Sequence, residues 1–414
     1  MTKTQNSISD CTLLISGAGM AGMTLAYTMA QAGLDVVLVD QTAIADTLDD
    51  GFDGRSSAIA YAPYKMYQAL GLWDRYFAST AQPIKEIRIT DGHSPLFLHF
   101  DQHDVGDGPM GYMLENRHIR RGLYEALTTE DDIKDKVRIL APLHITDLKI
   151  DGGYHRATLS DGRAIRARLI VSAEGRRSSL RNLQNIRLHQ WDYKQTAIVT
   201  TVKHQKSHHG IAYERFYPGG PFAILPLKGP YASIVWTEPT DLAATIMGLS
   251  EKAFNAELKK KFGDFLGPVK SLEKRWSYPL SLQLAETYVD ERFCLIADAA
   301  HGIHPIAGQG LNLGLRDIAA LAEVLIDCHR RGGDIGNAAV LSEYARWRRM
   351  DNHLMSLITD ALTRLFSNDV VPVRLARQWG LGLVEKIPGL KRFFIHHARG
   401  TVGTLPRLLD GKPL

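Results

Sequence analysis

The sequence predicts an α/β fold with a Rossmann-like domain, an inserted, mostly antiparallel β-sheet domain and a C-terminal helical segment. Three observations support this prediction. A glycine-rich turn near the N-terminus joins a short apolar strand to a helical stretch, and a second glycine-rich turn follows an apolar run at residues 293–296. Between the two turns, several short alternating runs are typical of strands. The chain is therefore expected to build two sheets from interleaved segments.

The first glycine-rich turn has the spacing of a dinucleotide-binding fingerprint. An apolar strand at residues 12–15 precedes it, a helical pattern follows at 23–32, and a second apolar strand at 34–39 ends in an acid. The backbone N–H groups of such a turn hold a pyrophosphate, and an acid about 20 residues further on holds a ribose. The predicted cofactor-binding residues are Gly17, Ala18, Gly19, Met20, Ala21, Gly22 and Asp40. This turn alone leaves both FAD and NAD open as ligands.

The second glycine-rich turn favours FAD, because a plain NAD site needs no second, distant motif. Asp298 follows the apolar strand and can hydrogen-bond ribityl or ribose hydroxyls. The turn itself opens a helix, whose N–H groups can meet negative charge. For His301, His304 and Pro305 we expect a positional role beside the turn, with a general base as the alternative for the two histidines. The predicted cofactor-binding residues here are Asp298, Gly308, Gln309, Gly310, Leu311 and Asn312.

These residues carry a family resemblance. Ala-Asp-Ala-Ala-His at 297–301, followed by His-Pro-x-Ala-Gly-Gln-Gly-x-Asn-Leu-Gly-x-x-Asp at 304–317, resembles the second FAD signature of class A flavoprotein monooxygenases. The form is that of the ubiquinone-biosynthesis hydroxylases. The family usually has glycine where this chain has Ala297, so a methyl group is expected close to the flavin phosphates.

Other segments resemble the same family. The stretch at 172–181 is similar to its Asp-Gly motif, associated with FAD and NAD(P)H, with Glu174 in place of the aspartate. For Arg176 and Arg177 a charged surface turn is an equal alternative. Arg55 falls where the family places an arginine near the flavin, with a solvated loop arginine as the alternative. The pattern Tyr-x-Arg-x-Arg-x-x-Asp at 344–351 resembles the close of the family's FAD domain.

The resemblance implies a p-hydroxybenzoate hydroxylase-like fold and an FAD-dependent monooxygenase. Such an enzyme uses O₂ and NAD(P)H or another electron donor, and hydroxylates the ring of a polyprenylated phenol in ubiquinone biosynthesis. The signature looks most like that of 2-polyprenyl-6-methoxyphenol hydroxylases. Because the flavin carries the chemistry, no protein residue is assigned as catalytic. The alternatives are a prenyl reductase, a hydroxylase of another aromatic, and a non-catalytic subunit of a quinone-synthesis complex. The ring carbon attacked and the prenyl chain length stay open.

The domain division follows from the order of the motifs. The FAD-binding domain is predicted at residues 1–80, 112–182 and 285–355, the substrate-binding sheet domain at 81–111 and 183–284, and the helical segment at 356–414. Strands are expected at 196–202, 211–216, 222–226 and 232–237, with a helical region at 242–265. In the family a similar strand crosses the flavin. Phe222, Leu225 and Pro226 are therefore predicted to line the substrate pocket.

Composition limits the class of protein. With 414 residues, 45% hydrophobic and 23% charged, the chain is an ordinary globular protein. Its three scattered cysteines suggest neither disulfides nor a metal site. The polar N-terminus has no secretory pattern, and no apolar run approaches the ~20 residues that span a bilayer. We therefore predict a cytoplasmic protein, with a peripheral position on the inner membrane as the alternative.

The C-terminal part is both basic and apolar. Residues 370–414 contain eight lysines and arginines against two acids, with aromatic and aliphatic side chains between them. Such helices can lie on an anionic membrane surface or contact a partner complex. A helical cap packed on the body with a solvated basic face is the equal alternative. No nucleic-acid-binding motif is present, so a nucleic-acid partner is not expected.

Overall fold

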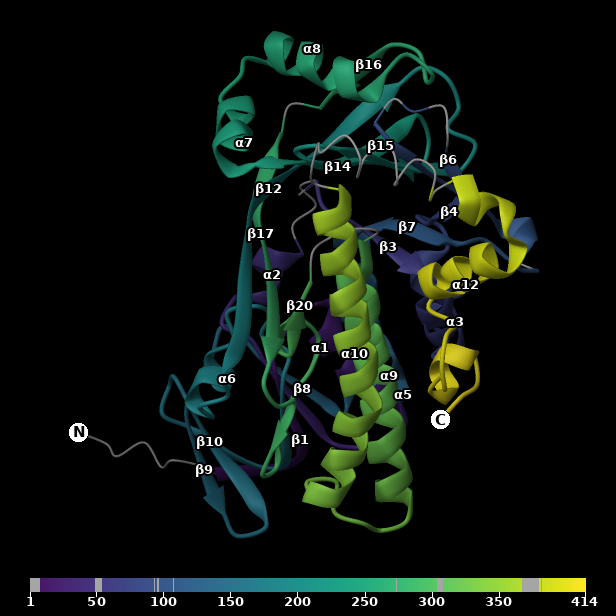
Figure 1. The fold of residues 1–414 in the computed structure, drawn as a ribbon. Coiled ribbons are helices and arrows are strands. Elements are labelled where there is room, and N and C mark those ends of the chain that lie inside the picture. Colours follow the sequence, from purple (N-terminus) through teal and green to yellow (C-terminus); the bar gives the residue numbers. More distant parts are fainter. Residues whose placement is uncertain are drawn as a thin grey trace.

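The structure is a computed structural model, and it describes residues 8–48, 54–92, 94, 97–106, 108–272, 274–303, 308–366, 380 and 382–414 (Figure 1). Helices and strands alternate along the described chain, and the strands form three sheets. The α/β fold class predicted from the sequence is confirmed.

The first sheet is mostly parallel. Its strand order is β18-β19-β11-β1-β2-β8, and β10 and β9 branch from β11. The neighbours from β19 to β8 are parallel, and the central strands are apolar runs buried on both faces, as parallel sheets require. The strands are β1 (Ile8–Ser16), β2 (Val36–Val39), β8 (Val137–Leu140), β9 (Ile145–Asp151), β10 (Tyr154–Leu159), β11 (Ala164–Ser172), β18 (Val289–Asp290) and β19 (Phe293–Leu295).

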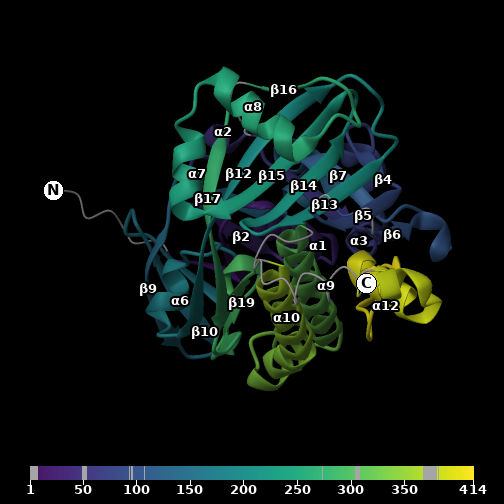
Figure 2. The same cartoon turned by 45° about the horizontal axis from the view of Figure 1, so that its top comes forward.

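The second sheet is antiparallel at every pairing except β13 with β5, and its order is β20-β17-β12-β15-β14-β13-β5-β6, with β16 beside β12. Helices α7 (Thr240–Met247) and α8 (Glu251–Phe262) cover its outer face (Figure 2). The strands are β5 (Glu86–Asp91), β6 (Phe97–Asp101), β12 (Leu188–His204), β13 (Ile211–Tyr217), β14 (Gly220–Leu227), β15 (Tyr231–Pro239), β16 (Val269–Ser271), β17 (Trp276–Ala285) and β20 (His301–Gly302).

A small third sheet has the strand order β3-β7-β4. Its strands are β3 (Ser56–Ala60), β4 (Gln82–Ile84) and β7 (Gly111–Glu115). The remaining short elements are α2 (Ile44–Thr47), α3 (Tyr61–Ala69), η1 (Trp73–Phe77), η2 (Gln102–Asp104), α5 (Asp131–Lys134), α6 (Ser179–Leu183) and η3 (Ala297–Ala299).

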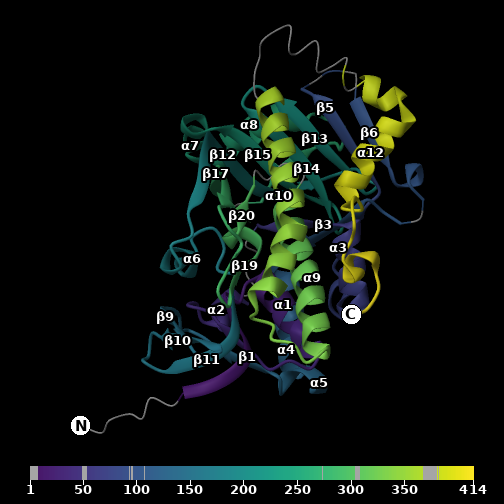
Figure 3. The ribbon, with the colours of Figure 1, turned by 60° about the horizontal axis from the view of Figure 1, so that its bottom comes forward.

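Longer helices pack around the first sheet. Helix α1 (Met20–Gln31) contacts both α4 (Asn116–Thr129) and α9 (Gln309–Arg330). Helix α10 (Ala338–Phe366) runs beside α9 (Figures 1 and 3). The two helices that follow the glycine-rich turns, α1 and α9, are therefore neighbours.

The C-terminal part is helical, as predicted. Helix α12 (Pro388–Arg399) buries Ile395 against Phe100 and Phe216 of the second sheet. The short helix η5 (Arg407–Asp410) packs on α3. This segment therefore contacts both large parts of the molecule.

Two local details differ from the sequence prediction. The helical region expected at 242–265 is two helices, because Ser250 caps a new helix by accepting a hydrogen bond from the Ala253 N–H at 3.3 Å. Strand β12 begins eight residues before the strand expected at 196, with a register shift between Asp192 and Thr196. The three cysteines, Cys11, Cys294 and Cys328, are buried and free.

Candidate active site

A large, mostly apolar cavity of about 930 Å³ lies between the second sheet and the second glycine-rich turn. One wall comes from the inward-facing side chains of β5, β6, β13, β14 and β15. The opposite wall comes from Gly308, Gln309, Gly310 and Leu311, with Asp298 beside them. Such a volume suits a ligand of drug-like size, and a mostly apolar lining with few polar groups is typical of small-molecule sites.

The first glycine-rich turn has room for a ligand at one glycine only. A Cβ on Gly22 would lie 1.8 Å from the Gly17 carbonyl oxygen, and a Cβ on Gly17 would lie 2.5 Å from the Ala173 carbonyl oxygen. A Cβ on Gly19 would meet no atom within 4 Å. Gly17 and Gly22 therefore allow close packing of the backbone. Gly19 leaves the backbone bare on the open side of the turn.

Helix α1 begins at this turn without a side-chain cap or an acid in its first turn. Its positive end is thus left for an anion. Asp40 lies beside it, and its Oδ2 accepts a hydrogen bond from the Ala18 N–H at 2.6 Å. The other oxygen accepts from the Thr42 N–H at 2.8 Å. A carboxylate has about four acceptor positions, so Asp40 can still accept from ribose hydroxyls.

Helix α9 begins in the same way at the second turn. Gly308 precedes it in the left-handed conformation, with φ 63°, and no side chain caps the helix. A Cβ on Gly310 would meet nothing within 4 Å. Asn312 instead secures the turn to β3: it accepts from the Ala60 N–H at 2.9 Å and donates to the Ala58 carbonyl at 2.7 Å. The predicted residue Asn312 is therefore buried behind the turn rather than at the cavity.

Asp298 reaches the cavity next to Arg176. Protein surrounds Asp298, but 46% of its side-chain surface is accessible because the side chain faces the cavity. Burial raises the pKa of Asp298, and the charge of Arg176, whose Nε is 3.9 Å from Asp298 Oδ2, opposes that rise. Arg176 is held by hydrogen bonds to the carbonyls of Ser281 at 3.0 Å and Ile303 at 2.8 Å. Arg55 also lines the cavity, whereas Arg177 is exposed.

Known proteins match this chain along nearly its whole length. The family described as FAD binding domain matches residues 10–350. A ubiquinone hydroxylase of Rhodospirillum rubrum is 48% identical over 417 residues, which cover 100% of this chain and 95% of that protein. A 3-demethoxyubiquinol 3-hydroxylase of Escherichia coli is 32% identical over 389 residues, covering 94% and 98% of the two chains. Among solved structures, p-nitrophenol 4-monooxygenase from Pseudomonas putida has a TM-score of 0.79 at 19% identity, covering 96% of this chain and 100% of that one.

The chain belongs to the FAD-binding flavoprotein monooxygenases. The predicted family and the predicted cofactor FAD are confirmed. The two bare helix ends, the open backbone at Gly19 and Gly310, and the acids Asp40 and Asp298 are the donors and acceptors that FAD requires. The residues present therefore fit this cofactor.

Both departures from the family motifs have a local explanation. Ala297 has φ 52°, a conformation that favours glycine, and its N–H donates to Asp317 Oδ2 at 2.9 Å. Its methyl faces Gly314 of α9 and does not line the cavity. Glu174 accepts from the Ser16 and Ser178 hydroxyls at 2.6 and 2.8 Å, so this carboxylate secures the loop after β11.

A buried polar cluster lies behind the flavoprotein's second turn. Asp317 is fully buried, and Oδ2 lies 2.5 Å from His301 Nε2 while Oδ1 accepts from Arg348 Nε at 2.8 Å. Burial would raise the pKa of Asp317, but His301 and Arg348 outweigh it and hold that pKa well below its ordinary value. His301 is thus buried against Asp317 and does not line the cavity, and its positional role stays a prediction. His304 and Pro305 lie outside the described residues.

Of the three residues predicted to line the substrate pocket, only Leu225 lines the cavity. Leu225 of β14 lines the cavity together with Pro221 and Ala223. Phe222 is fully buried on the opposite face, where its ring packs on Trp236 beneath α7 and α8. Pro226, which is also buried, does not line the cavity. The prediction was wrong for these two because successive residues of a strand point to opposite faces.

The sequence analysis missed one charged residue of the cavity, Glu214. It lies on β13 between Ala212 and Phe216, which also line the cavity. The alternation of residues in this strand could have shown that an acid falls on the apolar face.

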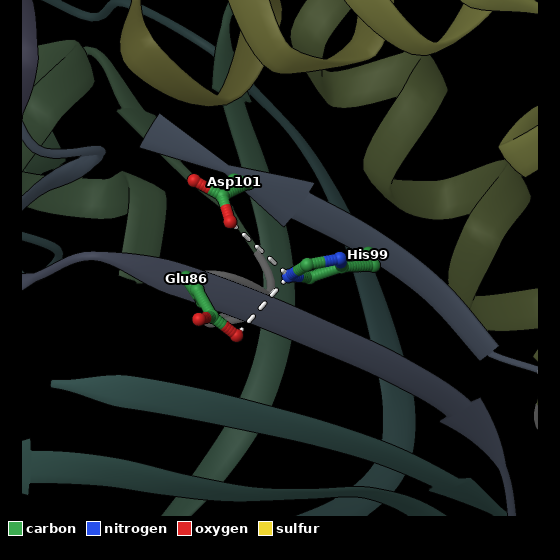
Figure 4. Close-up of side chains that lie close together, drawn as sticks. All are labelled: Glu86, His99 and Asp101. Atoms are coloured by element: carbon green, nitrogen blue, oxygen red, sulfur yellow. Dashed lines mark hydrogen bonds and ion pairs between the residues drawn. The ribbon is translucent and has the colours of Figure 1, made fainter. Parts of the chain in front are cut away.

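A second cluster of titratable groups lies on β6, at the edge of the second sheet, and on its neighbour β5 (Figure 4). His99 Nε2 is 3.1 Å from Glu86 Oε2 and 3.8 Å from Asp101 Oδ2. Arg88 donates twice to the same oxygen of Glu86, at 2.8 and 3.2 Å, so that oxygen is already engaged. The backbone N–H of His99 donates to Glu385 Oε2 at 2.8 Å. The two carboxylates therefore contact His99 within the sheet, and the His99 backbone N–H attaches the C-terminal segment to β6.

No helix in the described part of the chain has the length and hydropathy needed to cross a bilayer.

Proposed function

We propose that this flavoprotein hydroxylates the aromatic ring of a polyprenylated phenol in ubiquinone biosynthesis. The observation that carries the proposal is the apolar cavity of about 930 Å³ bounded by the second glycine-rich turn. The ubiquinone hydroxylase of Rhodospirillum rubrum, 48% identical over the full chain, supports the same substrate class. Bound FAD, reduced by NAD(P)H or another donor, supplies the activation of O₂ and the transfer of one oxygen atom.

In this proposal the chain's own residues hold FAD at both ends. The N–H groups at the start of α1 receive the pyrophosphate and Asp40 accepts from the adenosine ribose. Asp298 accepts from the ribityl hydroxyls, and the bare end of α9 stabilises negative charge on the flavin ring. The predicted segments 1–80, 112–182 and 285–355 would form this FAD-binding domain, with segments 81–111 and 183–284 as the substrate-binding domain.

The second sheet supplies the apolar wall. Ala223, Leu225 and Val235 place aliphatic groups in the cavity from adjacent strands. This wall removes apolar surface of a prenylated ring from water, and it keeps water away from the reacting oxygen.

The decisive experiment supplies purified holoenzyme with ¹⁸O₂, NADPH or NADH, and a 2-polyprenyl-6-methoxyphenol. The expected product is a phenol heavier by one ¹⁸O atom, identified by mass spectrometry. A reduced prenyl chain without heavy oxygen would favour a prenyl reductase instead. Donor oxidation that yields only peroxide with every prenylphenol would favour a hydroxylase of another aromatic. No flavin reduction by either donor, together with no product after chemical reduction of the flavin, would favour a non-catalytic subunit.

A charged residue in the wall tests whether the cavity is the substrate site. Leu225→Glu places an unpaired carboxylate against the apolar ligand, so turnover should fall at least a hundredfold while FAD remains bound. Leu242→Glu is the matched control, because Leu242 is exposed on α7. Equal turnover in the two variants would contradict the assignment of the cavity.

We also propose that the enzyme docks on a membrane surface through its C-terminal segment. Leu383 is 58% exposed and Phe393 is 50% exposed, and Phe393 also borders the cavity. Several of the basic residues serve packing instead: Lys391 lies 2.9 Å from both Asp104 and Glu385, and Arg399 stacks on the Tyr61 ring. The apolar side chains, more than the net charge, support the docking proposal.

Liposome sedimentation tests this docking. Leu383→Ser should reduce the bound fraction on vesicles that contain anionic lipid, because an apolar contact is lost. Ile150→Ser is the control, since Ile150 is similarly exposed but lies on β9 of the other sheet. Equal sedimentation of both variants and the wild type would leave only the packing role of this segment.

A further inference from the structure

The carboxyl of Glu214 is the one acid on the apolar wall of the cavity among the described residues. Glu214 lies on the central part of β13, opposite Ile89 of β5 and Ala223 of β14, and both neighbours line the cavity as well. The next residue, Arg215, points to the other face and donates to the carbonyls of Lys261 and Phe262 at 3.0 Å. Glu214 thus faces the cavity and is flanked by aliphatic side chains.

This carboxyl has no partner among the described residues. Glu214 is only 9% exposed, yet it forms no hydrogen bond or ion pair in that part of the chain. A structural acid of the same sheet behaves differently: Glu238 of β15, 4% exposed, accepts from Trp236 Nε1 at 2.7 Å and from Lys261 Nζ at 2.6 Å. Buried polar groups are nearly always satisfied, so an unsatisfied acid aimed into a ligand cavity indicates a partner on the ligand.

We propose that Glu214 is the polar anchor of the cavity: its carboxylate accepts the hydroxyl of a phenolic ligand and takes the proton of that hydroxyl. The inference rests on the proposed function and names the group that recognises the substrate. The phenol O–H bond breaks with its electron pair left on oxygen, and a new O–H bond forms on Glu214. One negative charge moves from the carboxylate to the phenolate, which spreads it over the ring, and no redox step is involved. The proton returns to the product oxygen after hydroxylation.

The surroundings of Glu214 favour this transfer. Burial raises the pKa of Glu214 to about 8, closer to the value of about 10 for a phenol than that of an ordinary glutamate. The other titratable or charged groups that line the cavity are Arg55, Arg176, Tyr213, Tyr278, Asp298 and His397. None of them bonds to Glu214.

The test compares a 2-methoxy-6-prenylphenol with its methyl ether, by calorimetric titration of the holoenzyme without an electron donor. The ether has the same apolar surface but no proton to donate. Between pH 7 and pH 9 the Glu214 carboxyl ionises, whereas an ordinary histidine is already mostly neutral at pH 7 and a phenol is still mostly protonated at pH 9. In the wild type, the preference for the phenol over the ether should therefore increase about tenfold over this interval.

Two variants identify the responsible group. In Glu214→Gln the preference should no longer change with pH, although every other titratable group remains. In Glu214→Leu the preference should disappear. Leu225→Ala, a control that removes wall surface without touching the acid, should weaken both ligands equally.

Three results would overturn the proposal. A tenfold change with pH that persists in Glu214→Gln would assign the effect to another group. Equal binding of phenol and ether by the wild type at both pH values would overturn it while leaving the hydroxylase function to the ¹⁸O₂ experiment. Failure of the wild type to bind either ligand would overturn both the anchor and the proposed substrate class.

Discussion

The stability of Glu214→Gln relative to the wild type should increase with pH. The side chain is buried without a partner, and burial raises its pKa from 4.5 to about 8. Between pH 4.5 and pH 8, Glu214 of the folded protein holds a proton that the unfolded chain has lost. The free energy of unfolding of the wild type therefore falls as pH rises through this interval, and glutamine, which does not titrate, removes the fall.

The magnitude follows from the two pKa values. Each pH unit between 4.5 and 8 costs the folded wild type about 1.4 kcal/mol. The cost is below about 1 kcal/mol at pH 5, roughly 3 kcal/mol at pH 7 and close to 5 kcal/mol above pH 8. The buried amide of glutamine has a cost of its own, but that cost is independent of pH. The slope with pH is thus the quantity to measure.

Urea unfolding of the holoprotein at pH 5, 7 and 9, with one fixed FAD concentration, measures this slope. Bound FAD adds the same free energy to both proteins at each pH and cancels in the difference. Glu238→Gln is the control: it breaks a buried pair with Lys261 and should destabilise the protein. A stability difference between Glu214→Gln and the wild type that is equal at pH 5 and pH 9 would refute the reasoning.

Three further predictions concern the cofactor site and the cluster behind it. Gly19→Ala should keep the melting temperature of the apoprotein but lower flavin absorbance, because its methyl meets no protein atom within 4 Å and lies on the open side of the turn. Gly22→Ala, whose Cβ would lie 1.8 Å from a carbonyl oxygen, should lower both the apoprotein melting temperature and the flavin absorbance; similar apoprotein melting temperatures for the two variants would contradict this. Asp298→Ala should lose most flavin absorbance while circular dichroism is unchanged, because an acceptor worth about 1–3 kcal/mol is removed, and full FAD occupancy would count against it. Asp317→Asn should lower the free energy of unfolding in urea by roughly 3–5 kcal/mol, because it breaks a buried pair with Arg348. The control Asp327→Asn, which breaks a more exposed pair with Arg407, should lower it by less than about 1 kcal/mol, and equal losses would argue against a buried network.

Much of the fold could be predicted because its signals are local. The strand, glycine turn and helix around Gly19 follow one another within 24 residues, from β1 to α1, and their periodicity and turn chemistry appear directly in the sequence. The same holds for the turn at Gly308 and for Asp298 after its strand. The break between α7 and α8 was harder to predict, because it depends on one serine, Ser250, that caps the start of α8 within a charged helical stretch.

The sequence by itself determined the family, the cofactor and the positions of four strands of the second sheet, β12 to β15, since motif spacing and side-chain alternation are properties of neighbouring residues. Only the tertiary structure decided which face of each strand meets the cavity: it turned Phe222 toward the helices and Glu214 toward the ligand space. It also separated the arginines, placing Arg176 at the cavity and Arg177 in solvent. The physical reason is that a strand has two faces of similar apolar character here, and contacts between segments far apart in the chain determine which one is covered by helices.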